Sequence, residues 1–315
     1  MPGGFAERSI LRRSQGRWLS VLSGIISAVT TSLESYEALA AEHLPPDAAA
    51  RWTALLRPCV RLRKASGTEP TAAQLGGKPL LPAGTPWPEW PDHGPLSFIA
   101  SINCAALPRD GVHPVFPADG TLLLFYFDGQ IDDGDAMVWA ADPETWAGAR
   151  VLYVPAGTQS ATAATPTGLD PYPRVDLTAA ARCSVPDPWH PRSLAALTND
   201  DAPLDPREIP SHIKTFMDAV YSGNNSIGHQ VGGHAHPVQG PVEYEIAHAM
   251  LGSKTLWTDP RLDEEAQRWL LLAQIDTDTD ANMTWGDCGT LYWLIRPEDL
   301  AARRFEEAKL TWQCC

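Results

Sequence analysis

The sequence predicts an α+β fold that is rich in strands, internally duplicated and preceded by extra helices at the N-terminus. Two observations lead to this fold class. The chain of 315 residues contains 29 prolines and 24 glycines, a frequency that favours strands and turns over a helical bundle. Four short blocks of the first half also recur, in the same order, in the second half. We therefore expect two related strand-strand-helix-strand halves that pack together.

The recurring blocks set the limits of the two halves. The numbers of residues that separate equivalent blocks differ only by the length of a surface loop. An order kept across four blocks is difficult to obtain by chance. The repeats are therefore expected over residues 74–154 and 230–314. The matching pairs are QLGGKP and QVGG (74–79 and 230–233), LSFIASIN and LLLAQID (96–103 and 270–276), GTLLLFYF and GTLYWLI (120–127 and 289–295), and PETWAGAR and PEDLAARR (143–150 and 297–304).

Each block also predicts a local structure. Apolar runs rich in β-branched and aromatic residues have the length of strands, and their lack of alternation predicts burial on both faces. A proline followed by acidic residues marks the first turn of a helix, where the negative charge meets the positive end of the helix dipole. Such short helices are expected at Pro143 and Pro297, each followed by a strand, at 151–154 and 309–314. The long strands are expected at 98–102, 121–127, 269–275 and 290–295.

Helices and an irregular connection are expected outside the repeats. Residues 1–45 are expected to form a helical extension, and residues 46–315 to form the duplicated domain. Asp47 and Ser211 each begin a helix. The Pro-, Ala- and Thr-rich stretch over residues 156–206 is expected to be an irregular connection between the repeats, with a helix after it.

Charge and cysteine content restrict the partners and the compartment. A net charge of −14 repels a phosphate backbone, which argues against nucleic acid, and attracts a basic partner protein. The six cysteines form no CxxC pair, as expected for a reduced, cytoplasmic protein. Export is the alternative, because arginines precede an apolar stretch over residues 18–29 as in a signal peptide. That stretch is too short and too polar to span a membrane, so no membrane partner is expected.

Several motifs resemble the YwqG-like family of bacterial proteins, whose biochemical role is not established. These motifs are QLGGKPLLPAGTPWPEW, LSFIASINCAALP, LLLAQID and MTWGDCGTLYWLI, and the resemblance covers about residues 55–315. It implies a duplicated, β-rich α+β fold, and it brings no catalytic residues with it. The family favours glutamine in both strand motifs: Gln274 keeps it, whereas Ser101 departs from it. An aromatic and an acidic residue usually stand where this chain has His234 and His236.

Three histidines surround a glycine pair in the segment HQVGGHAHPVQ, residues 229–239. If His234 and His236 lie on a strand, both imidazoles point to one face, as metal-binding barrels of the cupin type require. That pattern also needs a glutamate four or five residues further on, where this chain has Gly240 and Pro241. We therefore prefer surface or hydrogen-bonded histidines and keep a metal site as the alternative.

Acidic residues between the last two long strands have the ligand spacing of a calcium loop. Its sixth position is Ala281 rather than the usual glycine, and its twelfth is aspartate rather than a bidentate glutamate. Calcium or magnesium binding is therefore the alternative to a solvated hairpin loop, and no cofactor is assigned. Positions 1, 3, 5, 7 and 12 are Asp276, Asp278, Asp280, Asn282 and Asp287.

The preferred function is that of an acidic binding or interaction protein that neutralises or scaffolds a basic partner. We recognise no nucleophile with an adjacent base and no phosphate-binding glycine loop. The alternative is a metal-dependent enzyme, or a protein that binds a small ligand through polar residues of the second repeat. These residues stand at the ends of two neighbouring strands and in the loop before them. The candidate ligand-binding residues are Gln274, Asp276, Trp285, Asp287, His229 and Gln230.

Overall fold

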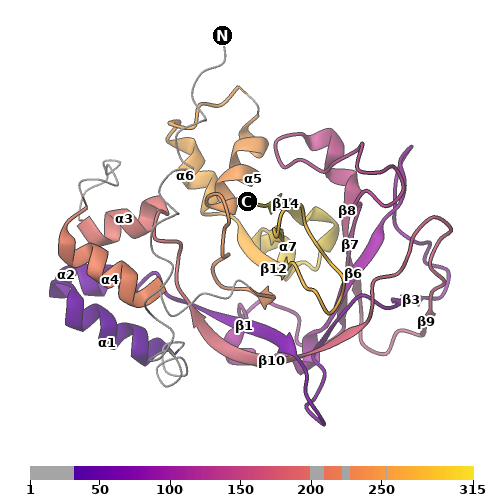
Figure 1. Cartoon of the computed structure of the whole chain (residues 1–315), viewed down its shortest axis with the longest axis horizontal. Helices are drawn as coiled ribbons and strands as arrows, with labels where there is room; N and C mark the ends of the chain where they lie inside the picture. The colour runs from indigo at the N-terminus through magenta and orange to yellow at the C-terminus, as the bar shows by residue number, and fades with distance from the viewer. Residues whose placement is uncertain (1–31, 199–208, 222–227, 253) are drawn as a thin grey trace, which may run out of the picture.

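The computed structural model describes residues 32–198, 209–221, 228–252 and 254–315 (Figure 1). A ten-stranded sheet forms the centre of an α+β fold, and every pairing in it is antiparallel. The expected fold class is confirmed at this level. In spatial order the strands are β14 (Lys309–Gln313), β13 (Thr290–Ile295), β12 (Leu270–Asp276), β11 (Gln230–Val231), β1 (Arg57–Lys64), β10 (Val175–Ser184), β2 (Ala73–Leu75), β6 (Ser97–Asn103), β7 (Thr121–Tyr126) and β8 (Ala149–Val154).

Two small strand pairs and several short helices decorate the loops. The pairs are β3 (Leu80–Pro82) with β9 (Ser160–Thr162), and β4 (Glu89–Trp90) with β5 (Gly94–Pro95). The 3-10 helices are η1 (Cys104–Ala106), η2 (Arg109–Gly111), η3 (Pro143–Gly148) and η4 (Phe305–Glu307), and α7 spans Pro297–Ala301. The two prolines expected to begin short helices therefore do so, one in a 3-10 helix and one in an α-helix.

The four long strands lie where the apolar runs predict them, as β6, β7, β12 and β13. All six residues of β13 are buried, because the sheet is covered on both faces. The pairing partners also correspond between the two ends of the sheet. Gln74 of β2 opposes Ser101 of β6, and Gln230 of β11 opposes Gln274 of β12. The order β2-β6-β7-β8 at one end thus has the same connectivity as β11-β12-β13-β14 at the other.

A glycine pair follows the short strand at each end, and both pairs have left-handed backbone conformations. The φ angles are 54° and 71° at Gly76 and Gly77, and 67° and 72° at Gly232 and Gly233. A side chain at Gly76 would collide with the Pro173 carbonyl oxygen. The expected reason for these glycines, backbone geometry and close approach, therefore agrees with their conformation.

The stretch over residues 156–206, expected to be irregular, contains a long strand and a helix. Residues 175–184 form β10, which pairs with β1 from Arg57–Ser184 to Lys64–Leu177 in the middle of the sheet. Its alanine-rich sequence VDLTAAARCS carries a weak strand signal, and pairing on both sides overrides the low intrinsic preference.

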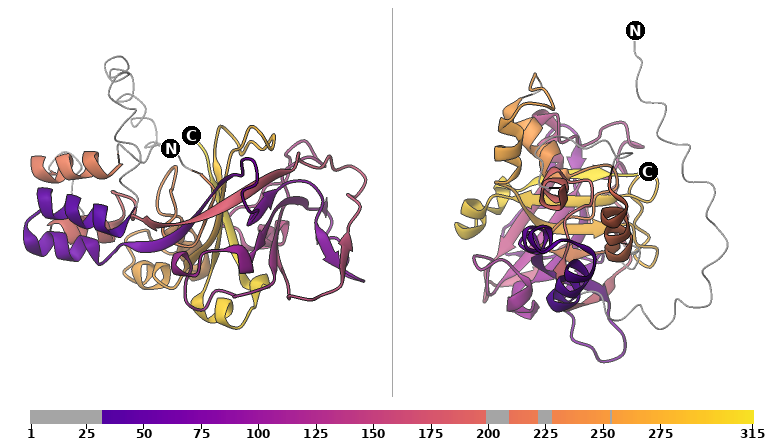
Figure 2. Two further views of the ribbon diagram at one scale, coloured as in Figure 1. Left: turned by 90° about the horizontal axis from the view of Figure 1, so that it is seen from below. Right: turned by 90° about the vertical axis from the view of Figure 1, so that its left-hand side faces the viewer.

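Four helices gather beside the start of β1 and the end of β10 (Figure 2). They are α1 (Leu33–His43), α2 (Pro46–Thr53), α3 (Pro191–Thr198) and α4 (Ser211–Tyr221). Their core is aromatic, with the Trp52 ring 4.8 Å from Phe216 and 6.3 Å from Tyr36. The helices expected at Asp47 and Ser211 are present, and of the expected N-terminal extension, residues 1–31 lie outside the described residues.

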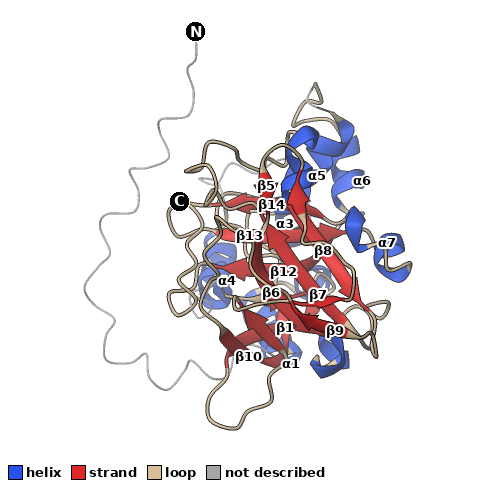
Figure 3. Cartoon of the chain, turned by 90° about the vertical axis from the view of Figure 1, so that its right-hand side faces the viewer, coloured by secondary structure: helices blue, strands red, loops and turns tan. Residues whose placement is uncertain are grey.

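Two further helices, α5 (Val242–Leu251) and α6 (Arg261–Ala266), pack together beside β12 (Figure 1). In the side view the strands occupy the middle of the molecule and the helices lie around it (Figure 3).

The sheet curls until its two edge strands, β8 and β14, approach each other. Tyr153 of β8 stacks on Phe305 at 5.4 Å, and Trp312 of β14 donates a hydrogen bond to the Val138 carbonyl. Within the described ranges, no helix has the length and apolar character needed to cross a membrane.

Candidate functional site

The structure brings together four of the six residues expected to bind a ligand. Gln230 and Gln274 oppose each other across β11 and β12. The Nδ1 atom of His229 accepts a hydrogen bond of 3.2 Å from the Asp276 backbone N–H. The other two residues lie elsewhere. Trp285 is buried with its ring 6.0 Å from those of Tyr126 and Tyr172, and Asp287 is exposed on a turn.

The gathered residues brace the chain rather than line an open site. Gln274 is fully buried, accepts a hydrogen bond from the His236 N–H at 2.9 Å and donates one to the Gly228 carbonyl at 2.8 Å. The Gln230 amide donates to the carbonyls of Gly232 and His234. Buried amide groups need such partners, and among the described residues only the Gln230 Oε1 atom of this pair lacks one. The hydrogen bonds of Gln274 fasten the segment around the glycine pair onto β12.

The aspartates with calcium-loop spacing are held by separate partners. Asp278 accepts a hydrogen bond from the Ala281 N–H, and the hydrogen bond with His229 lowers the pKa of its carboxyl. Asp280 forms an exposed ion pair with Lys64 at 2.9 Å. In Asp276, burial raises the pKa and the Thr290 hydroxyl opposes this effect. Among the described residues, no group of three or more His, Cys, Asp or Glu side chains is arranged to hold a metal ion.

The two histidines of the HxH pair also have separate partners. β11 ends at Val231, so His234 and His236 do not lie on a strand and their imidazoles do not share a strand face, contrary to the geometry that the metal alternative requires. His234 Nε2 donates to the Leu55 carbonyl at 2.6 Å, and His236 Nε2 accepts from the Arg61 guanidinium at 2.6 Å. Burial and the Arg61 charge lower the pKa of His236 to about 3, so its imidazole is neutral at pH 7. The left-handed glycines turn the chain away from the strand before the histidines.

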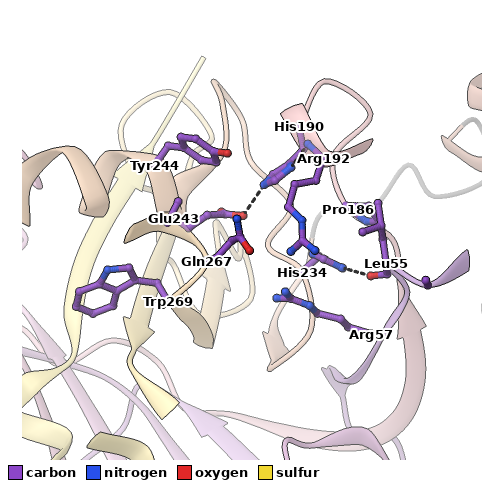
Figure 4. A pocket seen from close by; sticks show the side chains of 12 residues that line it. Leu55, Arg57, Pro186, His190, Arg192, His234, Glu243, Tyr244, Gln267 and Trp269 are labelled. Atoms are coloured by element: carbon purple, nitrogen blue, oxygen red, sulfur yellow. Dashed lines mark hydrogen bonds and ion pairs between the residues drawn. The ribbon is translucent and has the colours of Figure 1, made fainter. Parts of the chain in front are cut away.

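A cavity of about 60 Å³ lies beside His234, between the starts of β1 and α3 on one side and the α5–α6 pair on the other (Figure 4). A cavity of this size holds a few atoms the size of water. Apolar groups of Leu55, Pro186 and Trp269 form part of its wall. The remaining lining is polar and comes from segments far apart in the chain. The polar residues are Arg57, His190, Arg192, His234, Glu243, Tyr244 and Gln267.

The carboxylate of the cavity is already paired. His190 Nε2 lies 3.1 Å from the Glu243 carboxylate. Burial acts to raise the pKa of Glu243, but the hydrogen bond and charge of His190 outweigh it, so the pKa is lowered and the group is ionised. In His234, burial and then the Arg57 charge lower the pKa. His234 is therefore a neutral donor to the Leu55 carbonyl.

The cationic side of the cavity feels the Glu243 charge but has no hydrogen-bonded partner of this kind among the described residues. Arg57, the first residue of β1, is half-buried, and burial lowers the pKa of its guanidinium. Within the described part of the chain, no acceptor hydrogen-bonds to the Arg57 side chain. Arg192 also lines the cavity. Two guanidinium groups thus face one carboxylate that His190 already holds, and this arrangement suits an anionic group.

Sequence reasoning missed most of this cavity. His234 belongs to the segment singled out from the sequence, but Arg57, His190, Arg192 and Glu243 do not share a spacing pattern with it. Only the fold brings β1, the start of α3, the glycine-pair segment and the start of α5 together. The only sequence signal for this cavity was Glu243, an acidic residue seven positions after His236. Glu243 stands too far along the chain to complete a cupin motif.

Fold and site together define an α+β protein with a curled antiparallel sheet and a small charged cavity beside the start of β1. The chain matches the family described as a domain of unknown function, DUF1963, over residues 73–314. The protein therefore belongs to the DUF1963 family. Arg57 and the helices α1 and α2 precede the matched region. Among curated proteins, none matches this chain.

Proposed function

We propose that this protein is a binding protein whose cavity at Arg57 takes the carboxylate or phosphate group of a small molecule. One observation carries the proposal: a half-buried guanidinium lines the cavity and lacks an acceptor among the described residues. Because the guanidinium is partly withdrawn from water, an oxyanion competes with less water for its N–H donors than at an exposed arginine. The planar guanidinium matches the two oxygens of a carboxylate or phosphate group.

The test is thermal unfolding with a panel of oxyanions, namely acetate, citrate, phosphate and sulfate, with chloride added to match the ionic strength. A bound anion stabilises the folded protein by mass action. We expect at least one oxyanion to raise the melting temperature of the unaltered protein and of Arg63→Gln, but not of Arg57→Gln. Arg63 is the matched control because it is an exposed arginine on the same strand and pairs with Glu69. An equal rise in Arg57→Gln, or no rise with any of the four, would reject the proposal.

A basic partner protein is the second candidate function. It is favoured by the net charge of −14 and by a half-buried carboxylate, Glu245, that lines a cavity together with aromatic rings. The unpaired state of all six cysteines supports our proposal of a reducing, cytoplasmic location. A metal-dependent role for the Asp276 loop is the remaining alternative.

We also infer that the chain arose by internal duplication and that it is a YwqG-like member of its family. The matching strand neighbours at the two ends of the sheet support the duplication. So does a shared hydrogen bond: the Gln74 amide donates to the Gly76 carbonyl, and the Gln230 amide to the Gly232 carbonyl. Superposing residues 74–154 on 230–314 in an experimental structure tests this inference, and a failure of the long strands to overlap would reject it.

A further inference from the structure

A second cavity, of about 170 Å³, lies between α5, β14 and the loop that follows β7. Three tryptophans line it: Trp139 from the loop, Trp312 from β14, and Trp257 from the segment after α5. Trp139 and Trp257 are 53% and 64% exposed, which is unusual for the largest apolar side chain. Exposed aromatic residues that gather at one cavity mark a site of interaction.

The rings around this cavity are held in place. The Trp139 and Trp312 ring centroids are 5.9 Å apart, and Trp312 Nε1 donates to the Val138 carbonyl. His248 stacks on Trp257 at 4.3 Å with an angle of 10° between the rings. The His248 Nε2 atom donates to the Thr255 carbonyl at 2.8 Å, which fixes the orientation of the stack. The aromatic lining is thus organised before any partner arrives.

Glu245 of α5 also lines this cavity. One of its oxygens accepts a hydrogen bond from the Thr311 hydroxyl at 2.5 Å and the other accepts one from the Gln313 amide at 2.7 Å. Both donors are neutral, and no ion pair joins Glu245 to a cation of the described residues. Burial raises the pKa of this carboxyl, as expected for a negative charge without a counter-charge.

We propose that this cavity binds an arginine side chain presented by a basic protein segment. A guanidinium group stacks on tryptophan rings, and the Glu245 carboxylate supplies the opposite charge. The net charge of −14 attracts a basic segment from solution, and the exposed Leu256 beside Trp257 offers it apolar surface. The inference rests on the second candidate function and is independent of the anion cavity at Arg57.

The test measures binding of a fluorescein-labelled peptide of Arg-Gly repeats, with lysine and citrulline versions of the same peptide, by fluorescence polarisation. We expect saturable binding of the arginine peptide, weaker binding of the lysine peptide and none of the uncharged citrulline peptide. Trp257→Ala should weaken binding about fivefold because a cation–π contact is lost. Glu245→Gln, which keeps an oxygen acceptor, should weaken it by about tenfold or more.

Two control variants separate the cavity from general attraction. Trp189→Ala removes another tryptophan, 51% exposed, and Glu306→Gln removes one exposed negative charge. Both should bind the arginine peptide like the unaltered protein. Equal weakening in the controls, equal affinity for the lysine peptide, or no saturable binding would each overturn the proposal. If Glu245→Gln does not fold, Trp257→Ala decides the question, because its exposed side chain is not needed for the core. None of these outcomes bears on the anion proposal at Arg57, which is judged by the effect of oxyanions on the melting temperature.

Discussion

At the scale of single residues, the two glycine pairs and the buried histidines show how one short segment acquires its conformation. Gly233 has a φ of 72°, and its missing side chain leaves room for Cys59 and Ser184 of the neighbouring strands. The turn then delivers His234 and His236 to separate carbonyl and guanidinium partners. The histidines that suggested a metal site are therefore neutral hydrogen-bonding groups.

Replacing Gly233 by alanine should destabilise the protein more than the same change at Gly157. Both glycines have similar positive φ angles, 72° and 77°, so each substitution introduces left-handed strain of about 1 kcal/mol. At Gly233 the new Cβ would also lie 2.6 Å from the Cys59 Cβ, whereas nothing lies within 4 Å at Gly157. We expect the Gly233→Ala cost to reach about 3 kcal/mol in urea unfolding. Equal costs at the two positions would contradict the close approach of Gly233 to Cys59.

His236 should make stability depend on pH. Burial lowers its folded-state pKa from 6.5 to about 3, so the unfolded chain takes up the proton first. This contribution to stability is complete above about pH 6.5 and is lost as the pH falls from there toward 3, at about 1.4 kcal/mol per pH unit. His236→Gln should reduce the slope of unfolding free energy against pH between these limits by about that amount. Substituting the exposed His212 should leave the slope unchanged; an equal effect there would contradict the assignment.

At the scale of secondary-structure elements, the sequence predicts the strands and helices whose conformation depends mainly on their own residues. Apolar runs alone predict the strands β6, β7, β12 and β13. The prolines at 143 and 297 predict the short helices η3 and α7. β10 was not predictable, because its alanine-rich sequence becomes a strand only through pairing with β1 and β2. The cavity at Arg57 was not predictable either, because it forms only when distant elements meet.

The loop between β12 and β13 should be insensitive to metal ions. Its carboxylates are already engaged, with Asp278 bonded to His229 and Asp280 paired with Lys64. We expect neither calcium nor magnesium to raise the melting temperature of the unaltered protein. The comparison variant is Asp276→Asn combined with Asp287→Asn. A rise with metal that this double variant abolishes would instead favour the metal-dependent alternative.

At the scale of the whole molecule, helix α5 contributes residues to two cavities of opposite charge. The cavity beside the start of β1 is the one where Arg57 and Arg192 outnumber the paired Glu243, although the chain as a whole is strongly acidic. The region around α5 and β14 carries the tryptophan cavity with Glu245. Arg57 lines the first cavity half-buried and without an acceptor among the described residues, which is the basis for proposing anion binding there.

The most direct test of anion binding at Arg57 is a crystal structure of the protein after the crystals have been soaked in selenate. Selenate is an oxyanion that can be located by its anomalous scattering. We predict an anomalous peak within hydrogen-bonding distance of the Arg57 guanidinium, and no peak there in crystals of Arg57→Gln soaked in the same way. An empty cavity in the unaltered protein, or a peak that persists in the Arg57→Gln crystals, would contradict an anion site built on Arg57.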